Sequence, residues 1–192
     1  LTLLFLPFLT HAATLSLSAA TGAVGGTLSV PVLVSAAAGE SLNAISANFS
    51  FPKEQLTLVS ISKSPSIVTL WAQEPVFSNA NGTAALEGIV PNPGFSGTAG
   101  RVATLVFTVK APGAATISFT SASVLANDGK GTNILTDASA RTFTLTGAAA
   151  STPPQAPVAT PSALPASAFP ITSTTHPDQD RWYSARTGTF AW

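Results

Sequence analysis

Hydrophobic and polar residues alternate along several short segments of the chain. In residues 28–34 the aliphatic side chains of Leu28, Val30, Val32 and Val34 occupy every second position. The same period of two recurs in residues 45–51 and 103–109. A period of two places the apolar side chains on one face of a β-strand, and no segment shows the longer period of an amphipathic helix. The pattern therefore predicts an all-β domain over residues 14–146.

Shorter segments that are bounded by Gly, Pro, Asn or Ser predict the remaining strands. We expect these strands at residues 15–18, 56–61, 67–71, 76–78, 83–90, 115–119, 122–125 and 141–145. About nine or ten strands in a domain of this length, with Ser and Thr on the outer faces, predict two antiparallel sheets packed face to face as a β-sandwich. Pro31 cannot donate to a central ladder, so its strand is expected to have a free edge or a bulge there.

The first nine residues, LTLLFLPFL, are almost all apolar. This run is too short for a transmembrane helix, which needs about 20 residues, but it suits the hydrophobic segment of a signal peptide. Small residues follow, so a signal peptidase is expected to cut after Ala12 or Ala13. The charged segment that normally precedes the apolar run is missing, which we interpret as a truncated start. The alternative, a buried first strand, is disfavoured because the run does not alternate. We predict a bacterial protein that is exported to the cell surface or the medium, with residues 1–13 as the leader.

The composition changes after the last predicted strand. Residues 147–168 consist mainly of Pro, Ala, Ser and Thr, which is typical of a disordered, semi-extended linker. Polar and aromatic residues return in residues 169–192, where we expect the first strands of a further, truncated β-rich module. The aromatic anchors of that module would be Trp182, Tyr183 and Trp192.

The charge balance excludes several classes of function. Of the 192 residues only 8% are charged, and eight Lys and Arg balance eight Asp and Glu. So few basic residues provide no electrostatic footprint for nucleic acid and no polybasic membrane patch. The chain has no cysteine, which excludes disulfides, thiolate metal sites and cysteine nucleophiles.

Catalysis has little support in residues 14–146. This segment contains no histidine, so neither a Ser–His triad nor a histidine metal site can be built within it. Its carboxylates could in principle supply a glycosidase pair, but we interpret them as solvated loop residues. They are Glu40, Glu54, Glu74, Glu87, Asp128 and Asp137. We therefore predict a protein that is not an enzyme and that holds no cofactor.

Two segments have spacings that could suit a metal. Residues 127–133 place oxygen donors at alternating positions, but they offer one carboxylate where calcium prefers several among its ligands. A hairpin turn is the favoured interpretation of this segment. In the C-terminal segment His176, Asp178 and Asp180 are close in sequence, and a turn is again the favoured interpretation.

Four segments, in this order, resemble the cohesin family. They are GGTLSVPVLV at residues 25–34, LNAISANFSF followed by PKEQLTLVSI at residues 42–61, GRVATLVFTVK at residues 100–110, and ANDG at residues 126–129. The resemblance extends over about residues 14–146. It implies a nine-stranded jelly-roll sandwich, a fold shared with some carbohydrate-binding modules of extracellular polysaccharide-degrading systems.

The resemblance also implies a function and a surface that performs it. Cohesins are non-catalytic, and type I cohesins bind the calcium-loaded helical dockerin module through one flat sheet face. That face depends on polar side chains on the strand that runs here through residues 42–51. Ala44 and Ser46 stand where acidic and amide residues would be expected, and Phe51-Pro52 replaces the family's Tyr-Asp.

We predict a non-catalytic binding module that attaches a protein partner, such as a dockerin-like module, in a secreted or cell-surface, polysaccharide-degrading assembly. The candidate partner face comprises Ser46, Asn48, Ser50 and Glu87. A first alternative is carbohydrate binding, for which the candidate contacts are Trp71, Gln73 and Glu74, because exposed aromatic rings stack on sugars. A second alternative is a structural spacer in a surface stalk.

Overall fold

The computed structural model describes residues 12–148, 172–173, 175 and 190–191. The chain forms two units, Leu1–Ala149 and Ala150–Trp192. The predicted apolar leader segment, most of the predicted linker, and the residues His176, Asp178, Asp180, Trp182, Tyr183 and Trp192 lie outside the described residues. Within the described residues there is no helix long and apolar enough to cross a membrane.

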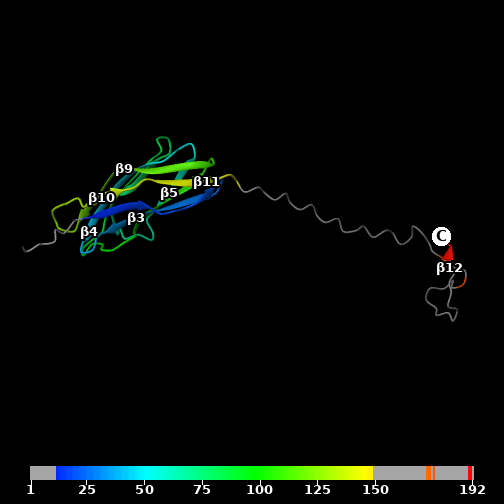
Figure 1. The fold of residues 1–192 in the computed structure, drawn as a ribbon, viewed down its shortest axis with the longest axis horizontal. Helices are drawn as coiled ribbons and strands as arrows, with labels where there is room; N and C mark the ends of the chain where they lie inside the picture. The colour runs from blue at the N-terminus through cyan, green and yellow to red at the C-terminus, as the bar shows by residue number, and fades with distance from the viewer. Residues whose placement is uncertain (1–11, 149–171, 174, 176–189, 192) are drawn as a thin grey trace, which may run out of the picture. The chain divides into compact units, whose positions relative to one another are not determined.

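The first unit is built from two β-sheets (Figure 1). The five-stranded sheet has the order β10 (Leu135–Ala138), β1 (Ala13–Leu17), β3 (Thr27–Ala36), β8 (Gly100–Val109) and β5 (Leu56–Ser62). The six-stranded sheet has the order β2 (Gly22–Ala23), β11 (Arg141–Thr146), β9 (Gly113–Ala126), β4 (Leu42–Ser50), β7 (Thr83–Ile89) and β6 (Leu70–Ser78). The all-β sandwich predicted from the alternation is confirmed.

Two short strands, β2 and β10, match none of the predicted segments. β2 and β10 have two and four residues, and each pairs in parallel with its neighbour, whereas the other pairings are antiparallel. The separate strands predicted at 67–71 and 76–78 are wrong, because β6 continues from Leu70 to Ser78. The strands predicted at 115–119 and 122–125 are likewise one strand, β9. In both strands the polar interruption of the pattern coincides with a shift of register and not with a turn.

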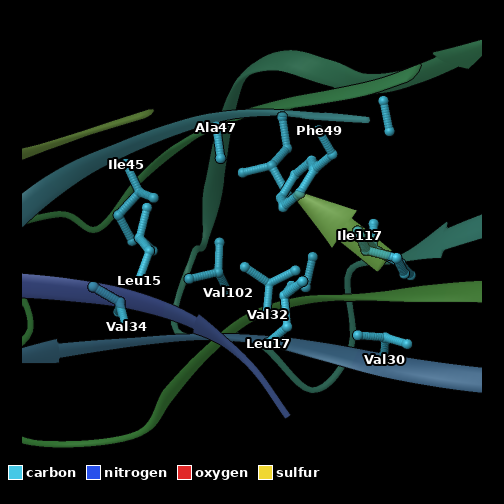
Figure 2. Packing of buried hydrophobic residues seen from close by; sticks show 14 of the residues in the cluster. Leu15, Leu17, Val30, Val32, Val34, Ile45, Ala47, Phe49, Val102 and Ile117 are labelled. Atoms are coloured by element: carbon cyan, nitrogen blue, oxygen red, sulfur yellow. The ribbon is translucent and has the colours of Figure 1, made fainter. Parts of the chain in front are cut away.

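The core lies between the two sheets. Ile45, Ala47 and Phe49 of β4 are at most 2% exposed and face Val32 and Val34 of the opposite sheet (Figure 2). The residues between them on β4 point away from the core because successive side chains of a strand alternate between its faces. The predicted inward faces of residues 28–34, 45–51 and 103–109 are thus all buried.

At Pro31 the neighbouring strand β1 has already ended. No strand therefore requires an amide donor at this position of β3. β1 ends at Leu17, which pairs with Val32, and the amide of Ser18 still donates to the Pro31 carbonyl at 2.9 Å. The amide position of Pro31 faces the same side, past the end of β1, so the missing donor leaves no ladder bond broken. The predicted free edge is therefore present, and a bulge follows at Val32 and Leu33 on the β8 side.

The described part of the second unit is small. β12 (Thr172–Ser173) pairs antiparallel with β13 (Phe190–Ala191).

We expect Phe107→Ala to lower the free energy of unfolding by about 3–5 kcal/mol, because it leaves a cavity in the core. Phe107 is fully buried, and its ring centroid lies 5.2 Å from that of Phe51 in an edge-on contact. Phe77→Ala is the matched control, since Phe77 is 41% exposed. Urea denaturation measures both, and equal losses would contradict the placement of the core.

Candidate functional site

The outer face of the six-stranded sheet is formed by the residues that alternate with the core. On β4 these lie opposite the outward residues of its two neighbours: Ser46 pairs with Glu87 on β7 and with Ser123 on β9. We call the surface over β9, β4, β7 and β6 the outer face. Its residues are Ala44, Ser46, Asn48, Ser50, Leu70, Gln73, Val76, Thr83, Ala85, Glu87, Ile89, Ser121, Ser123 and Leu125. The candidate partner residues Ser46, Asn48, Ser50 and Glu87 all belong to it.

Hydrogen bonds between side chains hold the middle of the outer face in one arrangement. The Ser46 and Ser123 hydroxyl oxygens lie 2.9 Å apart, and Asn48 Nδ2 donates to Ser121 Oγ at 2.7 Å. Both bonds cross from β4 to β9, so each side chain is fixed by its neighbour on the next strand. These side chains have little conformational freedom left to lose when a partner docks, which reduces the entropic cost of binding.

A shallow trough runs along β7 on this face. It consists of three adjoining hollows of about 400, 230 and 300 Å³. Asn48 and Ala85 line both the first and the second, and Glu87 lines both the second and the third. The methyl side chain of Ala85 lies between the longer side chains of Asn48 and Val76. Because it is shorter than both, the surface is hollow at this position. The trough was not predicted from the sequence, because the effect of the small Ala85 side chain depends on its neighbours on other strands.

The two ends of the trough are apolar. Val76, at 48% exposure, lines the first hollow. Ile89 and Leu125 line the third, and Leu70, at 55% exposure, lies opposite Ile89 on the neighbouring strand. Exposed side chains of this size gathered on one face mark an interaction surface more often than isolated ones do.

The outer face is almost free of charge. Glu74 and Glu87 are the two ionisable residues of β9, β4, β7 and β6. Glu74 Oε2 lies 2.6 Å from Lys63 Nζ, and because both side chains are well exposed this ion pair contributes little to stability. Glu87 has no ion-pair partner among the described residues. It is therefore the one carboxylate of the outer face that is left for a partner's cation.

The candidate carbohydrate contacts do not share one surface. Trp71 pairs with Gly88 on β7 and is partly buried against the hydrophobic core. Gln73 pairs with Glu87 and points to the outer face, where it lines the trough together with Glu74. The indole thus belongs to the rim of the core, and the two polar residues belong to the outer face.

Most carboxylates of the domain lie on its surface. In the part of the chain that the structure describes, no three residues of the types His, Cys, Asp and Glu are grouped so that they could hold a metal ion. Glu40 is 8% exposed, whereas Glu54, Glu74, Glu87, Asp128 and Asp137 are exposed.

Asp128 closes the turn predicted at residues 127–133. Its carboxylate accepts from the Thr132 hydroxyl at 2.5 Å and from the Lys130 amide at 2.8 Å. Gly129 and Gly131 have positive φ angles of 68° and 72°, which glycine adopts without strain. The hydrogen bond from Thr132, followed by that from Lys130, lowers the pKa of Asp128 below its usual value of 3.8. The loop thus uses its one carboxylate internally.

Comparisons with known proteins agree on one family. A family model described as "Cohesin domain" matches residues 13–145. No curated protein matches the sequence at a significant level.

Solved structures are similar in fold over the same region. The seventh ScaB type I cohesin from Pseudobacteroides cellulosolvens is 17% identical, with a TM-score of 0.59, and the match covers 72% of this chain and 94% of that one. A type I cohesin–dockerin complex from Clostridium thermocellum gives 13% identity and a TM-score of 0.58, with 70% and 99% covered. A cohesin module of a family 33 glycoside hydrolase from Clostridium perfringens gives 13% and 0.57, with 71% and 96% covered.

We expect Thr132→Val to raise the pKa of Asp128 toward 3.8, because it removes the strongest donor to the carboxylate. An NMR titration of the side-chain carboxyl carbon measures this. Thr116→Val is the control, since the Thr116 hydroxyl bonds Thr142 on another part of the sheet. A pKa that does not move in Thr132→Val would contradict the assigned hydrogen bond.

The lowered pKa also fixes the sign of a pH effect. The stabilisation from the Asp128 carboxylate is present above its unfolded pKa and is lost as the pH falls through the lowered folded pKa. Asp128→Asn should therefore be less stable than the unaltered protein at neutral pH, and the difference should close in acid below pH 3.8.

Proposed function

The chain belongs to the cohesin family, and from that premise we propose that it attaches a helical, dockerin-like protein module through the outer face. Cohesin domains are non-catalytic protein-binding modules. The observation that carries the proposal is the trough along β7, bordered by the hydrogen-bonded residues of β4 and by exposed apolar residues at both ends.

The spacing of the apolar ends suits a helix. Ala85 and Ile89 are four residues apart on β7, which corresponds to about 13 Å along a strand. A helix covers that distance with about nine residues, so apolar side chains two to three turns apart would occupy the two end hollows. An extended peptide would instead need unpaired strand-edge amides, and β7 lies between β4 and β6 in the sheet.

The chemistry of the outer face indicates which side chains a partner helix would present to it. Ala44 and Ser46 occupy positions where the family resemblance led us to expect acidic and amide residues. Recognition on this chain would therefore rely on apolar and hydroxyl contacts, with Glu87 as the one site for a basic residue. A partner helix with many basic residues would leave most of them unpaired, which disfavours it.

We further propose that the chain acts outside the cell, in a secreted or surface-bound assembly that degrades polysaccharides. The apolar run at residues 1–9 and the small residues after it support an export signal. The Pro-, Ala-, Ser- and Thr-rich residues 147–168 support a spacer between the binding domain and a further module.

Direct binding of polysaccharide finds no comparable support in the described residues. A sugar platform needs an exposed aromatic face, and Trp71 packs against the core. A purely structural spacer would not need exposed apolar side chains at both ends of a trough, so the observed surface favours attachment.

We expect Ser46→Arg to weaken binding of a dockerin module at least tenfold, because a long charged side chain would stand over the trough. Ser29→Arg is the matched control, since Ser29 lies on β3 of the opposite sheet. Isothermal titration with calcium-loaded dockerin modules from the same genome measures both. Equal affinities for the two variants would place the contact elsewhere, and a failure of every dockerin module to bind would overturn the proposed partner.

We expect the affinity for the same modules to change less than about fivefold between low and physiological salt, because the outer face offers a single free carboxylate. Glu87→Gln should remove what salt dependence remains while the protein stays folded. A steep salt dependence that survives Glu87→Gln would contradict this description of the face.

A further inference from the structure

We propose that Asn81 is a site of spontaneous deamidation, at which its side chain forms a cyclic imide with the amide nitrogen of Gly82. The two residues lie in the turn between β6 and β7. An asparagine that precedes a glycine is susceptible to this reaction, because glycine has no Cβ atom to hinder the approach of its nitrogen. The reaction needs no binding partner, so the inference stands apart from the proposed function.

Asn81 differs from the other asparagines of the chain in both its neighbour and its side-chain contacts. The chain has seven asparagines, and only Asn81 precedes a glycine. No hydrogen bond of the Asn81 side chain is found in the part of the chain that the structure describes, whereas side-chain hydrogen bonds hold most of the others. Those held are Asn48, Asn79, Asn92, Asn127 and Asn133. The remaining one, Asn43, lies within β4 and precedes Ala44.

The turn leaves both reacting groups free to meet. Asn81 is exposed, and among the described residues no hydrogen bond from the Gly82 amide is found. Gly82 is buried, but the attack takes place between adjacent residues and does not require the nitrogen to reach solvent. The exposed side chain of Asn81 lets ammonia leave and water enter.

The fold requires the glycine that makes Asn81 susceptible. Gly82 has a φ angle of 67°, which side chains other than glycine rarely tolerate. A Cβ atom at this position would also collide with the carbonyl oxygen of Phe51. The Gly82 carbonyl in turn accepts a hydrogen bond from the Phe51 amide at 2.8 Å. The packing of the turn against Phe51 therefore retains the susceptible pair.

The reaction proceeds in two steps without a change of oxidation state. In the first, the Gly82 nitrogen bonds to the Asn81 Cγ atom, the bond from Cγ to Nδ2 breaks, and ammonia leaves with the proton of the Gly82 amide. In the second, a water molecule opens the imide and a proton returns to the Gly82 nitrogen. Water that adds at Cγ yields aspartate. Water that adds at the main-chain carbonyl carbon yields isoaspartate, in which the main chain continues through the former side chain.

The chain has one other pair that could form the same imide, Asp128-Gly129, and the structure separates the two. The Asp128 carboxylate accepts hydrogen bonds from the Lys130 amide and the Thr132 hydroxyl, which lower the pKa of Asp128 and keep it ionised. An ionised carboxylate resists attack by an amide nitrogen far more than a carboxamide does. We therefore expect the reaction at Asn81 and not at Asp128.

Isoaspartate would disturb the turn because it adds one carbon atom to the main chain. The turn is anchored on both sides of Asn81: the Lys53 ammonium donates to the Ala80 carbonyl at 2.7 Å, and the Phe51 amide donates to the Gly82 carbonyl. The extra length must be accommodated between these two anchors. Aspartate leaves the length of the main chain unchanged, so we expect it to be tolerated.

The first test traps the imide with hydroxylamine, which cuts the chain between Asn81 and Gly82 where the imide forms. The full 192-residue chain is treated in buffer without denaturant and its fragments are weighed by mass spectrometry. We expect cleavage at this bond, and none in Asn81→Gln, whose longer side chain closes the ring much more slowly. The chain unfolded in urea is the positive control for the reagent. A folded chain that stays intact, or that is cut first at another asparagine, would overturn the inference.

The second test follows the reaction without a trapping reagent. After incubation at physiological temperature, trypsin releases residues 64–101, which contain Asn79 and Asn92 beside Asn81 as internal controls. We expect conversion at Asn81 to be about tenfold faster or more, because it alone precedes a residue without a Cβ atom. Equal rates at the three positions would contradict the inference.

The third test measures the effect on the turn. Incubated chains that carry isoaspartate at position 81 are compared in urea with Asn81→Asp, which introduces the same charge without lengthening the main chain. We expect the isoaspartate form to unfold at a lower urea concentration, because its turn must fit an extra atom between the two anchors. Equal midpoints would overturn this structural consequence.

Discussion

The period of two along each strand is the constraint on which both the core and the outer face depend. Ile45, Ala47 and Phe49 are buried between the sheets, and this burial forces Ser46 and Asn48 to point outward from the same strand. A slip of one residue would exchange the two sets, so the burial of the core fixes the register of the outer face as well. The hydrogen bonds from Ser46 and Asn48 to β9 then order that face side chain by side chain.

Much of the fold could be predicted from this period, and the deviations from the prediction coincide with bulges. Val102 and Ala103 are adjacent in the sequence and both are fully buried. The register between β3 and β8 skips Val102, and an extra residue in a strand breaks the alternation. The same effect at Thr120 made β9 look like two strands, because Phe119 pairs with Phe49 while Ser121 pairs with Asn48. A bulge is decided by pairing with another strand, which local sequence does not contain.

The candidate site was predictable in part for the same reason. The outward positions Ser46, Asn48 and Ser50 follow from the alternation on one strand, whereas the trough depends on four strands together. Trp71 shows the limit most clearly. Its neighbours Gln73 and Glu74 are exposed, but shifts of register along β6 turn the indole toward Gly88 and the core. The sequence spacing suggested one surface, and the irregular strand separates it into two.

Small residues on β7 allow the face and the core to change independently. A Cβ atom at Gly88 would lie 2.5 Å from the nearest methyl carbon of Val68, so the absence of a side chain lets the buried Val68 pack directly beneath the strand. On the other face, Ala85 leaves the trough open between Asn48 and Val76. A substitution at Ala85 or Glu87 would therefore change the shape or charge of the trough without displacing a core residue, whereas a substitution at Gly88 would act on the packing of the sandwich. Because alternate residues of one strand serve the two purposes, partner specificity can diverge while the sandwich is kept, which is consistent with a shared fold at sequence identities of 13–17%.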